Sequence, residues 1–343
     1  MKVLVKGLCL IYRSIVVVFF LVTTGCTTLG FNNIDGDSNN TTLDLDPNQS
    51  SEKVDVAASA INANKANNAK PKINANGLFE VKDGDVMLFG HLTPGGLIRG
   101  SVPVGSDVYV NDIKIPVTSD GYFAFGIGRD ESKTKYSFRV NGSKNSGEKG
   151  KVITLDIKKR EYDIQNVNGI SKKIMSPSAE DYKIIKRDVA MVNKARGEFH
   201  KNSSFMEDFI WPVEGIITGV YGSQRVYNGK PGRPHFGIDI AAPKGTDVKS
   251  PAGGLVTLAV PDMFYSGGTI IVDHGYKVTS TFLHMDELLV KVGDQVKQGD
   301  VIGKVGSTGR STGAHLDWRV NVGGVRLDAS MTVPPMPKQT KKD

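Results

Sequence analysis

The chain has very little cysteine. Its 343 residues include two, Cys9 and Cys26, and both lie within the first 26 residues. Two cysteines cannot form the framework of several disulfides that holds many small secreted domains together. Everything that folds after Cys26 therefore folds without disulfide bonds.

Long hydrophobic runs are scarce as well. The apolar run Ile15–Val22 is far shorter than the roughly 20 residues that a membrane-spanning helix needs. Hydrophobic residues make up 39% of the chain, which suffices for packed cores but excludes a protein with many membrane spans. The length predicts two domains with connecting segments.

Basic runs with interleaved aromatic residues are absent from the body of the sequence. The formal net charge is nevertheless +7, which favours attraction to polyanions. We expect no nucleic-acid partner, because an anionic cell-envelope polymer or a membrane surface fits this charge better.

The first 26 residues have the pattern of a targeting segment. Lys2, Lys6 and Arg13 precede the short apolar run, as in a cleaved signal peptide over residues 1–26. The segment Leu21–Cys26 resembles the lipobox of bacterial lipoproteins, in which the cysteine is lipidated and becomes the new N-terminus.

This lipobox match is incomplete, because Thr23 stands where the motif usually has leucine. We expect lipidation at Cys26, the alternative being a secreted protein whose cysteine is incidental. The resemblance implies a periplasm-facing protein bound to the membrane through a lipid anchor. Thr27, where some lipoproteins have aspartate, favours the outer membrane.

Residues 27–77 are rich in Asn, Asp, Ser, Ala and Lys and contain almost no aromatic residues. Such a composition cannot bury enough apolar surface to offset the entropy of ordering, so we expect a disordered tether.

From residue 78 to residue 163, short alternating apolar runs are separated by turn signals such as Pro94–Gly96. This pattern predicts a small β-sandwich.

Residues 164–209 form an expected linker with one helix. Apolar residues recur at helical spacing between Ser176 and Lys201. We expect His200, at the end of this helix, to lie on the surface.

Glycine-bounded strands return in residues 210–330, and a disordered tail is expected over residues 331–343. The predicted fold class is therefore mainly β, with a sandwich, a helical connector and a second β-rich domain.

Four of the six histidines lie in this second β-rich region. His235 and Asp239 are four residues apart, and His315 and Asp317 are two apart. Even spacing in an extended segment places both side chains of a pair on one face. His284 ends a predicted strand between the two pairs. Together these groups supply the nitrogen and oxygen donors of a metallohydrolase site.

Five segments of this region resemble the lysostaphin-type zinc endopeptidases, the M23 or LytM-domain family. The segments are Pro234–Val248, Gly267–Gly275, Thr281–Met285, Val292–Gly303 and Gly309–Trp318. The resemblance covers about residues 211–330, and the preceding sandwich region is similar to a Gram-negative, lipoprotein-like branch of the family. It implies the β-rich peptidase fold of that family.

Carried over residue by residue, the resemblance implies Zn2+ bound by His235, Asp239 and Asp317, with His284 and His315 as catalytic imidazoles. The aspartate at position 317 is a departure, because the family normally has a second histidine there. A carboxylate oxygen binds zinc at about 2.0–2.2 Å, so the number of ligands is kept. Two carboxylates and one imidazole nevertheless place more negative charge on the metal. His274 also lies in a matching segment, where we expect a structural role.

The implied function is a zinc-dependent endopeptidase that cleaves cross-links or stem peptides of peptidoglycan in cell-wall remodelling. The alternative is a non-catalytic LytM-type module that binds cell wall or activates a murein amidase. Degenerate modules of that kind typically lose several site residues, whereas only the third ligand is changed here, which favours the enzyme. A protein regulator, the cross-link that is cut and the oligomeric state stay open.

Overall fold

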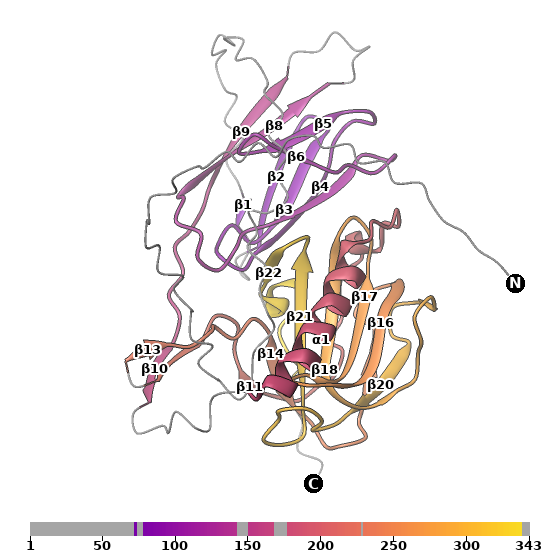
Figure 1. The fold of residues 1–343 in the computed structure, drawn as a ribbon. Helices are drawn as coiled ribbons and strands as arrows, with labels where there is room; N and C mark the ends of the chain where they lie inside the picture. Colours follow the sequence, from indigo (N-terminus) through magenta and orange to yellow (C-terminus); the bar gives the residue numbers. More distant parts are fainter. Residues whose placement is uncertain (1–71, 74–77, 143–149, 168–176, 228, 338–343) are drawn as a thin grey trace, which may run out of the picture. The chain divides into compact units, whose positions relative to one another are not determined.

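The computed structural model describes residues 72–73, 78–142, 150–167, 177–227 and 229–337. Strands dominate these residues, and the model has one α-helix in the described part of the chain, α1 (Ala179–Gly197) (Figure 1). The predicted fold class, mainly β with a helical connector, is confirmed. Cys26, the predicted signal peptide and most of the predicted tether lie outside the described residues.

Two antiparallel sheets form the N-terminal β region. One has the strand order β1-β2-β3-β4-β7 and the other the order β6-β5-β8-β9. The strands are β1 (Lys72–Ile73), β2 (Phe79–Asp83), β3 (Val86–Gly90), β4 (Leu97–Ser101), β5 (Asp107–Val110), β6 (Ile113–Ile115), β7 (Tyr122–Gly126), β8 (Lys135–Asn141) and β9 (Lys151–Asp156).

These two sheets share one apolar core, which makes the region a sandwich. Leu88 and Phe123 come from the first sheet and Phe138 and Leu155 from the second, and all four are fully buried. The rings of Phe123 and Phe138 stack with their centroids 5.4 Å apart. Buried and more exposed residues alternate along strands such as β5 and β8, which directs one face of the sheet at this core, whereas β4 and β7 have runs of consecutive buried residues.

The connector begins with β10 (Ile164–Val167) and continues, after an undescribed stretch, with α1. Ser178 caps the helix through a capping box with Asp181, which satisfies backbone N–H groups at the helix start. Ala195 of α1 packs against Leu258 and Ile271 of the sheet that follows. Among the described residues, no helix is both long and apolar enough to span a bilayer.

His200, just beyond α1, differs from the expectation of a surface side chain. Its Nδ1 lies 2.8 Å from Oδ2 of Asp273, a carboxylate that is 1% exposed. The side chain is 24% exposed, so it does lie partly at the surface, and it also lies 3.5 Å from Glu198. The expectation lacked these acidic partners, one of which is 73 residues away in sequence. This contact links the end of the connector to the C-terminal sheet.

A large antiparallel sheet forms the C-terminal β region, with the path β11-β14-β21-β18-β17-β16-β19. Its strands are β11 (Ile216–Gly219), β14 (Ile238–Ala241), β15 (Asp247–Lys249), β16 (Gly254–Met263), β17 (Gly267–Asp273), β18 (Val278–Leu288), β19 (Gln295–Val296), β20 (Val301–Val305), β21 (His315–Val322) and β22 (Val325–Leu327). A small separate sheet joins β10, β12 (Gln224–Tyr227) and β13 (Lys230–Pro231).

Central strands of the large sheet are buried along their whole length. All seven residues of β17 are buried, as are the first eight of β18. Trp318 of β21 is fully buried against a core that includes Phe282 and Ile240. Because β14, β21 and β18 lie side by side in this rigid sheet, side chains on their shared face are held in fixed positions.

Part of the predicted C-terminal tail is described. Residues Ala329–Thr332 form a short 3-10 helix, and Trp211 donates its indole N–H to the carbonyl of Pro334 at 2.8 Å. Residues 338–343 lie outside the described part. The predicted domain boundaries themselves stay predictions.

Candidate metal centre

The register of β14 and β21 brings the two predicted ligand carboxylates together. Asp239 of β14 lies directly opposite Asp317 of β21 in an antiparallel pair. Directly opposite residues of such a pair project their side chains from the same face at short distance. The two aspartates, 78 positions apart in the sequence, therefore meet at one point of the sheet.

His235 completes this cluster from the loop before β14. Its Nε2 lies 3.2 Å from Oδ1 of Asp239 and 3.6 Å from Oδ2 of Asp317. That nitrogen is buried and has no hydrogen-bond partner among the described residues. A buried polar atom without a partner is costly, so its surroundings are built for a group that would bind it.

The imidazole of His235 is strongly influenced by its neighbours. Burial lowers its pKa, but the carboxylates of Asp239 and Asp317 outweigh burial and raise the pKa to about 10. Two negative charges thus converge on one nitrogen. A cation placed among these three groups would satisfy the same attraction.

The spacing of the donor atoms fits a metal ion. Ligand atoms bound at about 2.0–2.1 Å in tetrahedral geometry lie roughly 3.3 Å apart. The measured separations of 3.2 and 3.6 Å from His235 Nε2 bracket that value. One possible ligand atom from each of His235, Asp239 and Asp317 lies within 4.8 Å of the other two. Three protein donors leave a fourth position for water or substrate.

Asp317 is held by a neighbour that the sequence patterns had not singled out. Arg319 donates from Nη2 to Oδ2 of Asp317 at 2.6 Å and from Nε to Oδ1 at 3.0 Å. Burial raises the pKa of Asp317, but the charges of Arg319 and then His235 more than offset this and hold the pKa well below its ordinary value. Asp317 is therefore an ionised, oriented carboxylate.

Two glycines let the backbone approach the aspartates closely. A Cβ on Gly219 would lie 2.2 Å from Oδ2 of Asp239, and one on Gly237 would lie 1.9 Å from Oδ1 of Asp317. Both distances are far below a normal contact, so any side chain at either position would displace a ligand carboxylate. The two glycines shape the site without contributing a functional group.

His284 lies within β18 rather than at its end as expected. Its backbone has φ of 64°, a left-handed conformation that is uncommon for residues with a side chain. Its Nδ1 lies 2.8 Å from the carbonyl oxygen of Thr308, to which it donates. Burial, the largest effect, lowers the pKa of His284, so its imidazole is neutral with Nε2 free to accept a proton.

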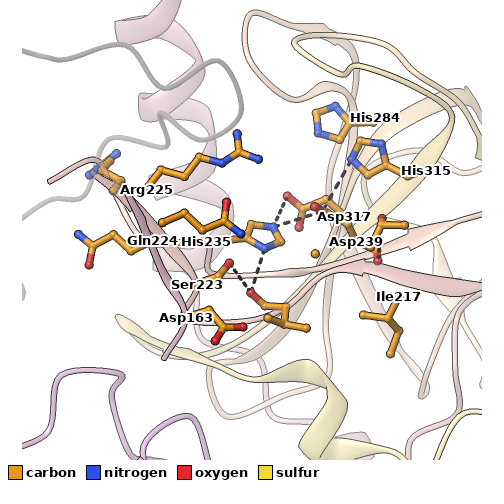
Figure 2. Close-up of a pocket in the computed structure, with 15 residues that line it drawn as sticks. Asp163, Ile217, Ser223, Gln224, Arg225, His235, Asp239, His284, His315 and Asp317 are labelled. Atoms are coloured by element: carbon orange, nitrogen blue, oxygen red, sulfur yellow. Dashed lines mark hydrogen bonds and ion pairs between the residues drawn. The ribbon is translucent and has the colours of Figure 1, made fainter. Parts of the chain in front are cut away.

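His315, at the start of β21, lies beside His284. The ring centroids are 4.8 Å apart, and Figure 2 shows both imidazoles next to Asp239 and Asp317. His315 Nδ1 lies 2.9 Å from the carbonyl of Gly313, and its Nε2 lies 3.7 Å from Oδ1 of Asp239. In both imidazoles, Nδ1 is thus held by a backbone carbonyl.

All five predicted site residues line one pocket of about 330 Å³ (Figure 2). Its wall also includes apolar side chains, Ile217 and Val220, and two cations, Arg225 and Arg233. The pocket therefore combines a metal-type cluster, a pair of imidazoles and positive charge.

The five side chains predicted from the sequence lie together in the structure, but the sequence patterns did not indicate Arg319, Gly219 or Gly237. The signal for Arg319 was present, because Asp317 and Arg319 are two residues apart on a strand. The glycines gave no such signal, since their importance depends on contacts between strands. The individual roles of the five residues stay predictions.

Comparisons with known proteins point to one family. Residues 233–329 match the model of peptidase family M23. DD-carboxypeptidase/endopeptidase Mpg of Neisseria meningitidis is 37% identical over 111 residues, 32% of this chain and 25% of that protein. Peptidoglycan DD-endopeptidase ShyB of Vibrio cholerae is 33% identical over 168 residues, 47% of this chain and 39% of that protein.

A solved structure described as a peptidase M23 of Pseudomonas aeruginosa has the same fold. It is 27% identical, has a TM-score of 0.54, and the match covers 70% of this chain and 94% of that chain. The chain spans well under half the length of the two curated relatives it matches. The resemblance to the M23 family expected from the sequence motifs is confirmed.

Proposed function

We propose, from the peptidase family M23 domain that residues 233–329 form, that this protein is a zinc-dependent endopeptidase acting on peptidoglycan. The observation that carries the proposal is the cluster of His235, Asp239 and Asp317 beside the two imidazoles of His284 and His315. The relatives named as peptidoglycan DD-endopeptidases support the substrate class.

In this proposal His235, Asp239 and Asp317 hold the zinc ion. Bound zinc supplies Lewis acidity, which acidifies water and polarises the carbonyl of the peptide bond. The donor set of one imidazole and two carboxylates suits zinc, and the ion would bind Nε2 of His235, which is buried beside both carboxylates without an aligned hydrogen bond.

His284 and His315 handle protons and developing charge. Because Nδ1 of His284 donates to Thr308, its neutral ring presents Nε2 as an acceptor for a proton from the attacking water. His315 is fixed in the same way by the carbonyl of Gly313. Once protonated, either ring can donate a hydrogen bond to the oxyanion of the tetrahedral intermediate.

Substrate peptides reach these groups through the pocket. Arg225 and Arg233 line it and give it positive charge, which suits the carboxylate-bearing stem peptides of peptidoglycan. Ile217 and Val220 offer apolar contact for aliphatic parts of the same peptides.

A cleavage assay tests the proposal. The purified chain is incubated with cross-linked muropeptides, with and without a chelator, and then with added Zn2+. We expect cleavage that the chelator stops and zinc restores. Absence of chelator-sensitive cleavage, together with stimulation of a purified murein amidase, would instead establish the non-catalytic module.

Attachment of the enzyme to the outer membrane through a lipid on Cys26, facing the periplasm, belongs to the same proposal. The lipobox-like segment before Cys26 supports it. Labelling cells with radioactive palmitate should mark the wild-type chain and leave Cys26→Ser unlabelled. Equal labelling of both chains would contradict the anchor.

A further inference from the structure

The third ligand position differs in charge from the pattern that the sequence resembles. Asp317 is an anion where that pattern has a neutral imidazole. A set of one imidazole and two carboxylates carries two negative charges, whereas two imidazoles and one carboxylate carry one. Unless something offsets the added charge, the metal at this site becomes a weaker Lewis acid.

Arg319 supplies the opposite charge at the correct place. Its Nη2 and Nε contact the two oxygens of Asp317 at 2.6 and 3.0 Å. The side chains of Arg319 and Asp317 are 4% and 2% exposed, so water screens their attraction very little. A two-point contact of this kind also fixes the plane of the carboxylate.

We propose that Asp317 and Arg319 act together as one neutral ligand unit, in which Arg319 is the positioning residue that orients Asp317 and offsets its charge. The pair then gives the zinc ion the same net charge as a second imidazole would. This inference rests on the zinc site of the proposed function, but it does not depend on which bond is cleaved.

The contacts of Asp317 are compatible with binding a metal while Arg319 stays in place. A carboxylate oxygen has two lone pairs, so it can accept a hydrogen bond and bind a metal at once. Oδ2 accepts from Nη2 of Arg319 and lies 3.6 Å from Nε2 of His235. The backbone of Gly237 packs against the same pair, since a Cβ there would lie 2.9 Å from Cγ of Arg319.

A second buried cation makes the pairing more important. Arg196 of α1 donates to the hydroxyl of Thr281 at 2.9 Å, and Thr281 is the partner of Arg319 in the β18–β21 register. Burial first, and the charge of Arg319 second, lower the pKa of Arg196 to about 10. Replacing Asp317 by a neutral residue would take away the carboxylate that Arg319 contacts, while the charges of Arg319 and Arg196 would still act on each other.

Zinc affinity across a double-mutant cycle tests the inference. Four full-length chains are compared by competition with a chelating indicator: wild type, Asp317→His, Arg319→Met and the double variant. We expect Asp317→His alone to bind zinc about tenfold more weakly or worse, although it restores the resembled ligand. The double variant should regain most of that loss, because its imidazole no longer lies beside the buried positive charge of Arg319.

Controls separate this role from simple support of the fold. Circular dichroism checks that each chain is folded. If Arg319→Met alone does not fold, the double variant still serves, because it removes the negative and the positive charge together. Arg319→Lys retains the positive charge but cannot make the two-point contact. Its zinc affinity should lie between those of Arg319→Met and the wild type. Arg99→Met removes a buried arginine of the sandwich. It should leave zinc affinity unchanged both in the wild type and in Asp317→His.

Two results would overturn the inference while the zinc site stands. One is Asp317→His binding zinc as tightly as wild type with Arg319 present. The other is Arg319→Met changing the affinity by the same factor with Asp317 and with His at position 317. If the wild-type chain itself bound no zinc, the proposed function would fail, and this inference with it.

Discussion

The two β regions of this protein bury very different side chains. In the sandwich, the buried polar or charged side chains among the described residues are Arg99, Ser106 and Thr118. In the C-terminal sheet and its short extensions they include Asp273, His274, Thr279, Ser280, Thr281, His284, Asp317, Arg319 and Asn321. Both regions also have an apolar core of buried residues, so the difference between them lies in the buried polar groups.

This difference coincides with the location of the proposed site. Burying ionisable groups costs free energy, and proteins accept that cost mainly where a site needs perturbed pKa values or oriented donors. In the sandwich, the buried residues are almost all apolar, including the consecutive buried residues of β7. The C-terminal sheet departs from this pattern on the strands β18 and β21 that carry His284, His315 and Asp317.

The largest expected effect concerns an imidazole of the site. His284→Ala removes the proposed proton acceptor and should lower muropeptide cleavage by about a hundred- to ten-thousand-fold. The comparison variant His91→Asn, in the sandwich, should keep wild-type turnover. Equal losses in both variants would mean that the contrast between the two regions has no functional meaning. Steady-state kinetics provides the measurement.

A core substitution in the sandwich should affect stability alone. Leu88 is fully buried, and Leu88→Ala should lower the free energy of unfolding of this region by about 2–5 kcal/mol. Zinc affinity should not change. Val104→Ala, at a position 68% exposed, is the matched control and should change stability by less than about 0.5 kcal/mol. Denaturant titration and zinc competition measure the two properties.

A single methyl group should damage the metal site. Gly237→Ala places a Cβ where Oδ1 of Asp317 lies and should weaken zinc binding by about ten- to a hundredfold. Gly324→Ala, where a Cβ would meet nothing within 4 Å, should bind zinc normally. Unchanged affinity in Gly237→Ala would show that Asp317 is not a ligand.

The smallest effect concerns pH. His274 is fully buried, with Nδ1 donating to the carbonyl of Gly253 and Nε2 facing the hydroxyl of Ser280. Burial lowers its pKa. The unfolded chain therefore binds a proton more readily than the folded chain. Stability from this group is present above about pH 6.5 and is lost as the pH falls below that value.

Substitution isolates that contribution. His274→Gln should unfold with a free energy that depends less on pH between about 7.5 and 5.5 than that of the wild type. A slope identical to wild type, from denaturant titrations at several pH values, would mean that His274 is not the group responsible.

Much of this architecture could be predicted from local patterns. Alternation and turn signals predicted the sandwich, and the helix start at Ser178 follows its capping sequence. The even spacing of His235–Asp239 and His315–Asp317 predicted that these four side chains belong to one site, and the structure places them around one pocket. Each of these features depends on residues close together in the sequence.

Features that depend on strand register could not be predicted. Nothing local places Asp239 opposite Asp317, or Gly237 against Asp317, because those contacts depend on how distant strands pair. The His200–Asp273 contact was missed for the same reason. Arg319 is the exception, since its spacing of two residues from Asp317 on one strand places both side chains on the same face.

The most direct test of the central claim is the zinc content of the purified chain. Wild type should hold about one zinc ion per chain by atomic absorption. Asp317→Ala should hold almost none while keeping a wild-type circular dichroism spectrum. Full zinc retention in a folded Asp317→Ala chain would contradict the assignment of His235, Asp239 and Asp317 as the metal centre.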